Sequence, residues 1–152
     1  MSLSMLVLSL VVKSSAFSGG QPIPKEHSCQ GENTPPPLEV ELPSGAQSWA
    51  MIVDDPDAPS GTFTHWTIWN LPAKQKTLGA IPAEAKQGKN DFGKSGWGGP
   101  CPPPGKPHHY RFRVFALDGK LDLAPGASPS DLERAMKGHV VGEGTLVGTY
   151  RR

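Results

Sequence analysis

The sequence predicts a mostly β protein, and three observations lead to that prediction. Glycine and proline are abundant, at 18 and 17 of 152 residues, yet they follow no fixed repeat. Short apolar runs rich in β-branched and aromatic residues recur between the turns. Helical periodicity occurs convincingly only near the C-terminus, so strands do not alternate with helices as in a parallel α/β sheet. The length suits one domain over residues 1–152.

The first predicted element is the apolar run MLVLSLVV at residues 5–12. It is too short to cross a bilayer, which takes about 20 apolar residues. No Lys or Arg precedes the run, and no small-residue cleavage site separates it from Lys13, so it lacks the pattern of a secretory signal. We therefore expect a strand buried on both faces, no stable membrane insertion and a cytoplasmic protein, with export left open.

Further strands follow in chain order. LEVEL at residues 38–42 alternates apolar and acidic side chains, as a half-buried strand does. SWAMIVD at 48–54 is a continuous apolar run, typical of a strand covered on both faces. HWTIWNL at 65–71 and HYRFRVFAL at 109–117 are rich in aromatic and β-branched residues. Residues 72–107 show little periodicity and predict a long loop region, which is often functional.

One helix is predicted, over residues 128–140. Ser130 and Glu133 fit a capping box, and Pro129 suits the first helical turn. Its apolar face consists of Leu132, Ala135 and Met136. The segment GEGTLVGTYR at 142–151 predicts a last strand.

Charge and cysteine content exclude some classes of function. The chain has 15 Lys and Arg against 14 Asp and Glu, without a dominant basic stripe, so nucleic-acid binding has little support. Two cysteines, Cys29 and Cys101, are too few for a disulfide scaffold and lack zinc-knuckle spacing. One bridge between them is an alternative, but two reduced thiols, as is usual in the cytoplasm, are the simpler expectation.

The most unusual stretch is the acidic turn DDPDAPSGTFTHW at residues 54–66. Asp55 and Asp57 alternate with prolines, which restrict the backbone, and His65 opens the next predicted strand. Asp54 is interpreted as the polar end of the preceding strand. Aspartates in such turns often cap their own backbone, and a histidine can be a hydrogen-bonded core residue, so each residue taken singly fits a structural role.

A second polar group, HHY at 108–110, follows the Gly- and Pro-rich loop GGPCPPPGKP at 98–107. If the two flanking strands share a sheet, His65 and His108 lie at strand entrances and can meet. A carboxylate that accepts from one ring nitrogen orients an imidazole, and leaves the other nitrogen for an anion, a proton transfer or a metal. As a set these residues favour a site, because histidines and carboxylates are costly to bury without partners.

A family resemblance rests on four blocks: NTPPPLEVELPSGAQSWAMIVDDPDAP, HWTIWNLP, GWGGPCPPPGKPHHYRFRVFALD and GHVVGEGTLVGTY. Together they resemble the phosphatidylethanolamine-binding protein family, above all its short bacterial and archaeal, Raf-kinase-inhibitor-like branch. The likeness runs from about residue 14 to the C-terminus. It implies a β-sandwich with a large central sheet, a smaller flanking sheet and a helix near the C-terminus, and a small anion pocket at one end.

The resemblance also implies which residues form that pocket. Gly99 and Cys101 would contribute backbone donors, and Pro59 would line the rim. His109 stands where many relatives have arginine, and the two-residue period of a strand should turn it away from the pocket. The ligand-binding residues that the resemblance implies are Asp55, Asp57, Pro59, His65, Gly99, Cys101, Pro102, His108 and Tyr110.

Three functions are consistent with these residues. The first is non-catalytic binding of a small anionic or phosphorylated ligand, such as a phospholipid head group, with modulation of a protein kinase or protease partner. The second is an acid–base enzyme, for example an isomerase, cyclase or weak hydrolase, with His65, His108 and Asp55 as candidate catalytic residues. The third is a metal site built from the same three side chains. We expect binding rather than catalysis, no cofactor and no metal, and leave a dimer open.

Overall fold

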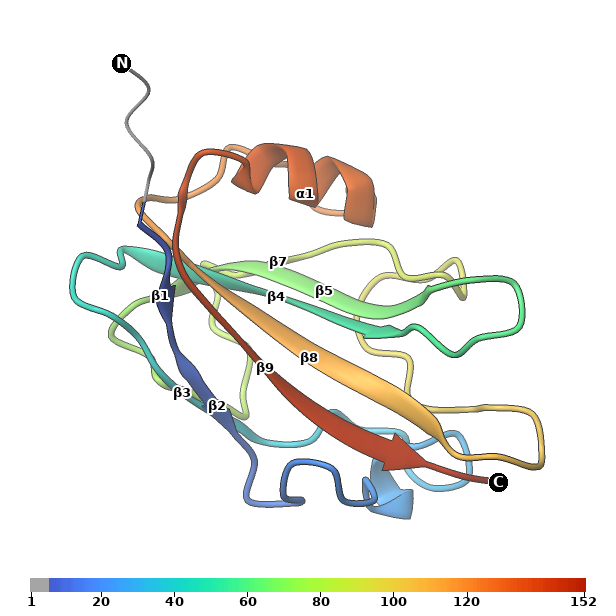
Figure 1. Cartoon of the computed structure of the whole chain (residues 1–152). Coiled ribbons are helices and arrows are strands. Elements are labelled where there is room, and N and C mark those ends of the chain that lie inside the picture. The colour runs from blue at the N-terminus through green and yellow to red at the C-terminus, as the bar shows by residue number, and fades with distance from the viewer. Residues whose placement is uncertain (1–5) are drawn as a thin grey trace.

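The computed structural model describes residues 6–152, and its strands form two sheets (Figure 1). The larger sheet has six strands, in the order β1 (Leu8–Ser9), β9 (Val140–Tyr150), β8 (His108–Leu117), β4 (Ser48–Asp55), β5 (Phe63–Pro72) and β7 (Lys86–Gln87). The smaller sheet has three, in the order β2 (Val11–Lys13), β3 (Leu38–Glu41) and β6 (Thr77–Leu78). Neighbouring strands are antiparallel except β1 and β9, which are parallel. The helical segments are η1 (Lys25–His27) and α1 (Pro129–Met136).

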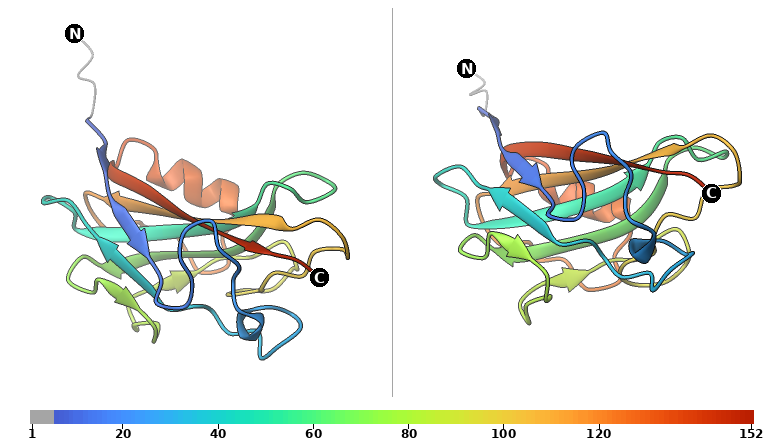
Figure 2. Two further views of the ribbon diagram at one scale, coloured as in Figure 1. Left: turned by 60° about the horizontal axis from the view of Figure 1, so that its bottom comes forward. Right: turned by 90° about the horizontal axis from the view of Figure 1, so that it is seen from below.

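The larger sheet is covered on both faces. Figure 2 shows the smaller sheet stacked on one face, with α1 on the other. Strand β4 serves both sides because its side chains alternate: Trp49 and Val53 lie in the core between the sheets, whereas Ala50 and Ile52 pack in the core that includes Leu132 of α1. The predicted β-sandwich with a large sheet, a smaller flanking sheet and one helix near the C-terminus is therefore confirmed.

The strands predicted at residues 38–42, 48–54, 65–71 and 109–117 correspond to β3, β4, β5 and β8. All eight residues of β4 are buried, as a continuous apolar run predicts, and β3 alternates between buried and exposed residues. The long region at 72–107 contains two short strands, β6 and β7, which add to the two sheets. No helix in the described part of the chain is long and apolar enough to cross a membrane.

The apolar N-terminal run differs from its prediction. Met5 lies outside the described residues, and the rest forms two short strands instead of one strand buried on both faces. β1 is one of the two edge strands of the larger sheet and β2 one of the two in the smaller sheet, with the buried Leu10 between them. Leu8 and Val11 stay 43% exposed. Apolar composition overstated burial here because an edge strand has a neighbour on one side only.

The capping box of α1 also lies elsewhere than predicted. Ser128 is the N-cap: its Oγ accepts the Asp131 N–H at 3.1 Å, and the Asp131 carboxylate accepts the Ser128 N–H at 3.3 Å. The prediction of Ser130 and Glu133 is wrong because SPSDLE contains two Ser–acid pairs at the same spacing. Pro129 decides between them, since proline is favoured at the first helical position, directly after the N-cap.

Candidate functional site

A cavity of about 190 Å³ lies at one end of the larger sheet, where β4 ends and β5 and β8 begin. The loops that follow β4 and precede β8 extend at this same end (Figure 1). An apolar cavity of about 150 Å³ is enough for benzene, so there is room for a small ligand. The residues that line it are Asp55, Ala58, Pro59, Phe63, His65, Phe92, Cys101, Pro102, Pro103, His108 and Tyr110.

Two residues implied by the resemblance, Asp57 and Gly99, do not line this cavity. The Asp57 carboxylate accepts hydrogen bonds from the His109 backbone N–H at 2.8 Å and from its Nδ1 at 2.7 Å. The Gly99 N–H donates to Asn33 Oδ1 at 2.9 Å, so it is not free for a ligand. A side chain at Gly99 would meet that oxygen at 2.2 Å, so glycine is required there for close packing.

His65 reaches the cavity because of a bulge in β5. The pairing with β4 passes from Trp66 directly to Thr64 and leaves His65 without a partner. A bulge re-aims side chains, and here the His65 ring packs edge-on against Tyr110 of β8, with 5.2 Å between ring centroids. The sequence reasoning placed His65 at the start of a strand but gave no signal for the bulge.

The His65 imidazole is buried and held by the loop before β8. Its Nδ1 lies 2.6 Å from the Gly98 carbonyl oxygen, which can only accept, so Nδ1 carries the proton. Burial lowers the pKa of His65, and the weaker opposing effects of the Gly98 hydrogen bond and the Asp55 charge do not restore it. At neutral pH the ring is therefore uncharged, and Nε2 offers a lone pair to a ligand.

His108 is held by a carboxylate instead. Its Nδ1 lies 2.7 Å from Asp55 Oδ2, and both side chains are nearly buried, at 13% and 5% exposed. The other oxygen of Asp55 accepts the Asp57 N–H at 2.8 Å, so the proline-framed turn fixes the carboxylate from behind. The pair thus orients the imidazole and leaves Nε2 as its free nitrogen.

Tyr110 adds a hydroxyl donor beside the two histidines. The residue is 1% exposed, and its hydroxyl has no hydrogen-bond partner among the described residues. Burial raises the pKa of Tyr110, and the negative charges of Asp55 and Asp57 raise it further. The side chain is therefore a neutral phenol at all ordinary pH values. A buried donor without a partner calls for an explanation, and a ligand oxygen provides one.

Two aromatic residues that the sequence reasoning missed form an apolar wall. The Phe63 and Phe92 rings lie 4.8 Å apart, and both pack against the His65 ring. Asn90 shapes the turn that presents Phe92, because its Oδ1 accepts the Phe92 N–H at 3.0 Å and its Nδ2 donates to the Gly96 carbonyl at 2.9 Å. For Phe92, the only signal in the sequence was the length of the loop region at 72–107; for Phe63 the reasoning found none.

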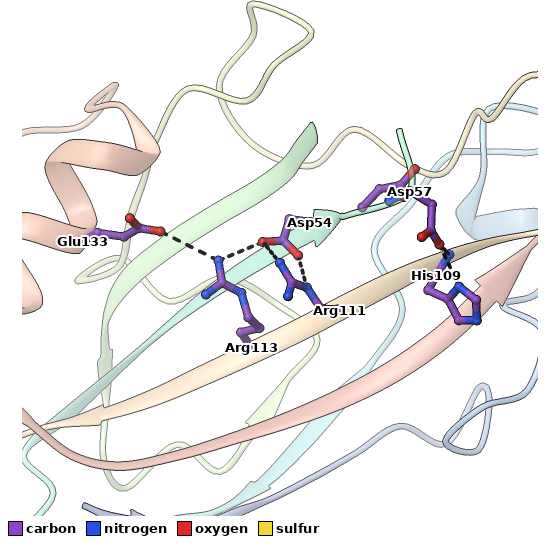
Figure 3. A network of polar contacts seen from close by, with 7 residues as sticks. Asp54, Asp57, His109, Arg111, Arg113 and Glu133 are labelled. Carbon is purple, nitrogen blue, oxygen red and sulfur yellow. Dashed lines mark hydrogen bonds and ion pairs between the residues drawn. The ribbon is translucent and has the colours of Figure 1, made fainter. Parts of the chain in front are cut away.

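Asp54 lies at the polar end of β4, as interpreted, but faces the opposite side of the sheet in an arginine cluster that was not predicted. It is 1% exposed and accepts hydrogen bonds from Arg111 at 2.7 and 3.0 Å and from Arg113 at 2.8 Å. Figure 3 shows Arg113 reaching on toward Glu133 of α1, at 3.8 Å. The partners lie almost sixty residues away in sequence, so local pattern could not reveal them.

Cys29 and Cys101 form a disulfide, so the expectation of two reduced thiols is wrong. Their Cα atoms are 5.4 Å apart although 72 residues separate them in sequence. Disulfides are typical of oxidising compartments and also occur inside hyperthermophiles. The cytoplasmic location thereby loses its argument from cysteine usage and stays a prediction.

The proposed metal-ligand set of His65, His108 and Asp55 gains no support from the geometry. Within residues 6–152, no three His, Cys, Asp or Glu side chains converge in a way that could hold a metal ion. In particular, Asp55 already uses both carboxylate oxygens, for His108 and for the Asp57 N–H. What the cavity offers a ligand is two ring nitrogens, one hydroxyl and an apolar wall.

Comparisons with known proteins agree with this architecture. Residues 13–151 match the family model described as phosphatidylethanolamine-binding protein. The chain is 48% identical over 149 residues to the UPF0098 protein of Pyrococcus horikoshii, covering 91% of this chain and 75% of that protein. It is 40% identical over 144 residues to LppC of Mycobacterium tuberculosis, whose name marks it as a candidate lipoprotein, covering 93% and 72%. A crystal structure of CT736 from Chlamydia trachomatis, described as a homologue of this family, superposes with a TM-score of 0.89 at 38% identity, covering 95% and 98%.

Proposed function

The chain belongs to the phosphatidylethanolamine-binding protein family, and on that premise we propose that its cavity binds a small ligand through a phosphate-like anionic head. One observation carries the proposal. His65 and His108 are each anchored through Nδ1, which leaves two Nε2 atoms beside a Tyr110 hydroxyl that has no partner among the described residues. Three polar atoms held in fixed orientations in one small cavity suit a compact oxygen-rich group.

The donor and acceptor pattern favours a singly charged head over a doubly charged one. Neutral His65 accepts through Nε2, Tyr110 donates, and His108 donates through Nε2 when its ring is protonated. The monoanion of a phosphate monoester presents both acceptor oxygens and one P–O–H donor, which matches this set. Among the described residues, no Lys or Arg lines the cavity, so the lining suits one negative charge better than two.

The ligand's remaining atoms would meet the apolar wall of Phe63 and Phe92, which suits the carbon-bearing part of a phosphomonoester or of a lipid head group. We also predict that binding modulates a protein kinase or protease partner. The cytoplasmic location likewise remains a prediction. A dimer also stays a prediction.

The test is a titration with inorganic phosphate and with O-phosphorylethanolamine, followed by calorimetry and by NMR of the imidazole signals. We expect His65→Ala and His108→Ala each to lower the affinity about tenfold or more, the effect of losing a hydrogen bond to a charged group. His109→Ala is the matched control, because His109 is the next residue along β8 but bonds Asp57 outside the cavity. Equal losses in all three variants, or no binding at millimolar phosphate, would refute the proposal.

The same titration, repeated at several pH values, tests which protonation state of the phosphate binds. Affinity should fall as the pH rises from 5 to 8, because a phosphomonoester loses its second proton near pH ~6 and the doubly charged form fits this donor and acceptor pattern less well. A flat profile would contradict the preference for the monoanion.

A second candidate function, acid–base catalysis, is favoured by one observation. The cavity holds a histidine kept neutral by burial, His65, next to a histidine paired with a carboxylate, His108. That pairing is how an enzyme separates a base from an acid. Turnover of an ester or carbonyl substrate that disappears in both histidine variants would favour this function over binding alone.

A further inference from the structure

The segment of residues 99–103, named the wall because Cys101, Pro102 and Pro103 line the cavity, has few backbone N–H groups that can form hydrogen bonds. Proline lacks an N–H, so a proline-rich segment cannot be held by its own backbone donors. The prolines at this wall and directly after it are Pro100, Pro102, Pro103 and Pro104. The bonds that hold this segment in place must therefore come mainly from other parts of the chain.

Most of the contacts that hold the wall come from the strap, defined as residues 25–34, and Arg152 adds a hydrogen bond to the Pro102 carbonyl at 3.4 Å. The Cys29 N–H donates to the Pro100 carbonyl at 3.1 Å, and Asn33 accepts the Gly99 N–H at 2.9 Å. The Cys29–Cys101 disulfide adds the covalent link between strap and wall. Both cysteines are exposed residues, so a reductant in solution can reach the bond.

The strap is the better-anchored of the two segments. Next to Cys29, Ser28 is fully buried, and its hydroxyl donates to the Tyr150 hydroxyl at 2.8 Å. Tyr150 ends β9 and pairs directly with His108 in the larger sheet. The disulfide thus ties a wall with few bonds of its own to a point fixed on the sheet.

The wall affects the shape of the cavity and the position of the His65 ring, through two sets of contacts. Cys101, Pro102 and Pro103 line the cavity themselves. Three residues before Cys101, Gly98 donates its N–H to the His65 carbonyl at 3.0 Å, and its own carbonyl accepts the His65 Nδ1–H at 2.6 Å. A displacement of the wall would therefore change the cavity shape and the orientation of the His65 ring together.

We propose that the Cys29–Cys101 disulfide is a redox latch, which holds the cavity in its ligand-binding form when oxidised and lowers ligand affinity when reduced. The proposal rests on the function proposed above. A dithiol is the reductant: its thiolate attacks one sulfur, a mixed disulfide forms, and the second thiol displaces the remaining protein sulfur. The protein gains two electrons and two protons as two thiols, and the dithiol leaves as a cyclic disulfide.

The experiment compares the affinity for inorganic phosphate of the oxidised protein and of the same protein treated with dithiothreitol. We expect a loss of about tenfold on reduction, within the range usual for coupling between two sites, and full recovery on reoxidation. Cys29→Ser breaks the bond without changing a residue that lines the cavity. It should bind like the reduced wild type and be insensitive to dithiothreitol. Equal affinity in the two redox states would overturn the latch.

Amide hydrogen exchange separates failure of the latch from failure of the proposed function. On reduction, exchange should quicken at Gly98 and Gly99, whose N–H groups donate to His65 and Asn33, while the amides of β4 and β8 stay protected. This readout needs no ligand, so it decides the latch even if the oxidised protein binds no phosphate, a result that would refute the proposed function alone. Unchanged exchange would overturn the latch. So would unfolding of β4 and β8, because the bond would then support the whole fold.

Discussion

Two consecutive aspartates at the end of β4 face opposite sides of the same sheet and have opposite kinds of partner. Asp54, on the α1 side, accepts three hydrogen bonds from two guanidinium groups. Asp55, on the sandwich side, accepts one from the His108 ring and one from a backbone N–H. Both carboxylates are buried, so burial does not distinguish them.

The two carboxylates differ in the side chains that bind them, arginines for Asp54 and a histidine for Asp55. Arginine stays charged at all physiological pH values, and the hydrogen bond to Asp54 raises the pKa of Arg111 further. The Asp54 cluster is therefore permanent and leaves its carboxylate no role toward a ligand. The Asp55 side offers a titratable ring with one nitrogen still free. An acid-rich turn is thus a poor guide to function until the partner of each acid is known.

The largest expected effect is on the arginine side. Asp54→Asn should lower the free energy of unfolding by about 3 kcal/mol, the lower end of the cost of breaking a buried ion pair, because the two arginines are partly exposed. The affinity for phosphate should stay within about twofold of wild type. Urea unfolding and calorimetry measure the two quantities. A stability loss below about 1 kcal/mol would mean that the cluster behaves as an ordinary surface pair.

On the cavity side, Asp55→Asn should act mainly on binding. The asparagine keeps the shape of the side chain but cannot pair with a protonated His108. We expect the affinity for phosphate to fall by about 2 kcal/mol, or about thirtyfold. Calorimetry at pH 6 gives the affinity, and urea unfolding should show a smaller stability loss than for Asp54→Asn. The reverse order of the two stability losses would contradict the division between the faces.

Tyr110→Phe tests whether the cavity side serves binding, because it removes a hydroxyl that has no partner among the described residues. Phosphate affinity should fall about tenfold, since a ligand oxygen loses its donor. Stability should stay the same or rise slightly, because a buried hydroxyl without a hydrogen bond is costly. A clear loss in the melting temperature, without a change in affinity, would show that the hydroxyl serves the fold instead.

The smallest effect belongs to the exposed pair of Asp57 and His109. Hydrogen bonds from His109 lower the pKa of Asp57 below its ordinary value of 3.8. A carboxylate whose pKa is lower in the folded chain stabilises that chain above about pH 5, and loses this contribution as the pH falls through its folded-state pKa. Both side chains are about half exposed, so we expect less than ~1 kcal/mol. Urea unfolding of wild type and Asp57→Asn should differ at pH 6 and coincide near pH 2.

The sequence pattern predicted those features that depend only on residues close together in the chain. The strand that became β4 followed from its apolar run, and the outward direction of His109 followed from the period of two. The arginine partners of Asp54 were missed because Arg111 and Arg113 come from another strand, and the pairing of Cys29 with Cys101 likewise joins residues far apart in sequence. Sequence spacing carries no information about such distant neighbours, so local pattern could not predict these features.

The pairing of β1 with β9 has a consequence for the order of folding. Leu8 pairs with Gly142, almost the whole length of the described chain away. Contacts so distant in sequence form slowly, because the entropy cost of closing a long loop comes before the contact adds any stability. During synthesis on the ribosome, the apolar segment around Leu8 would have no partner strand to pair with until β9 had been made. We therefore expect the larger sheet to complete itself only once β9 is available, with the docking of β1 as a late step.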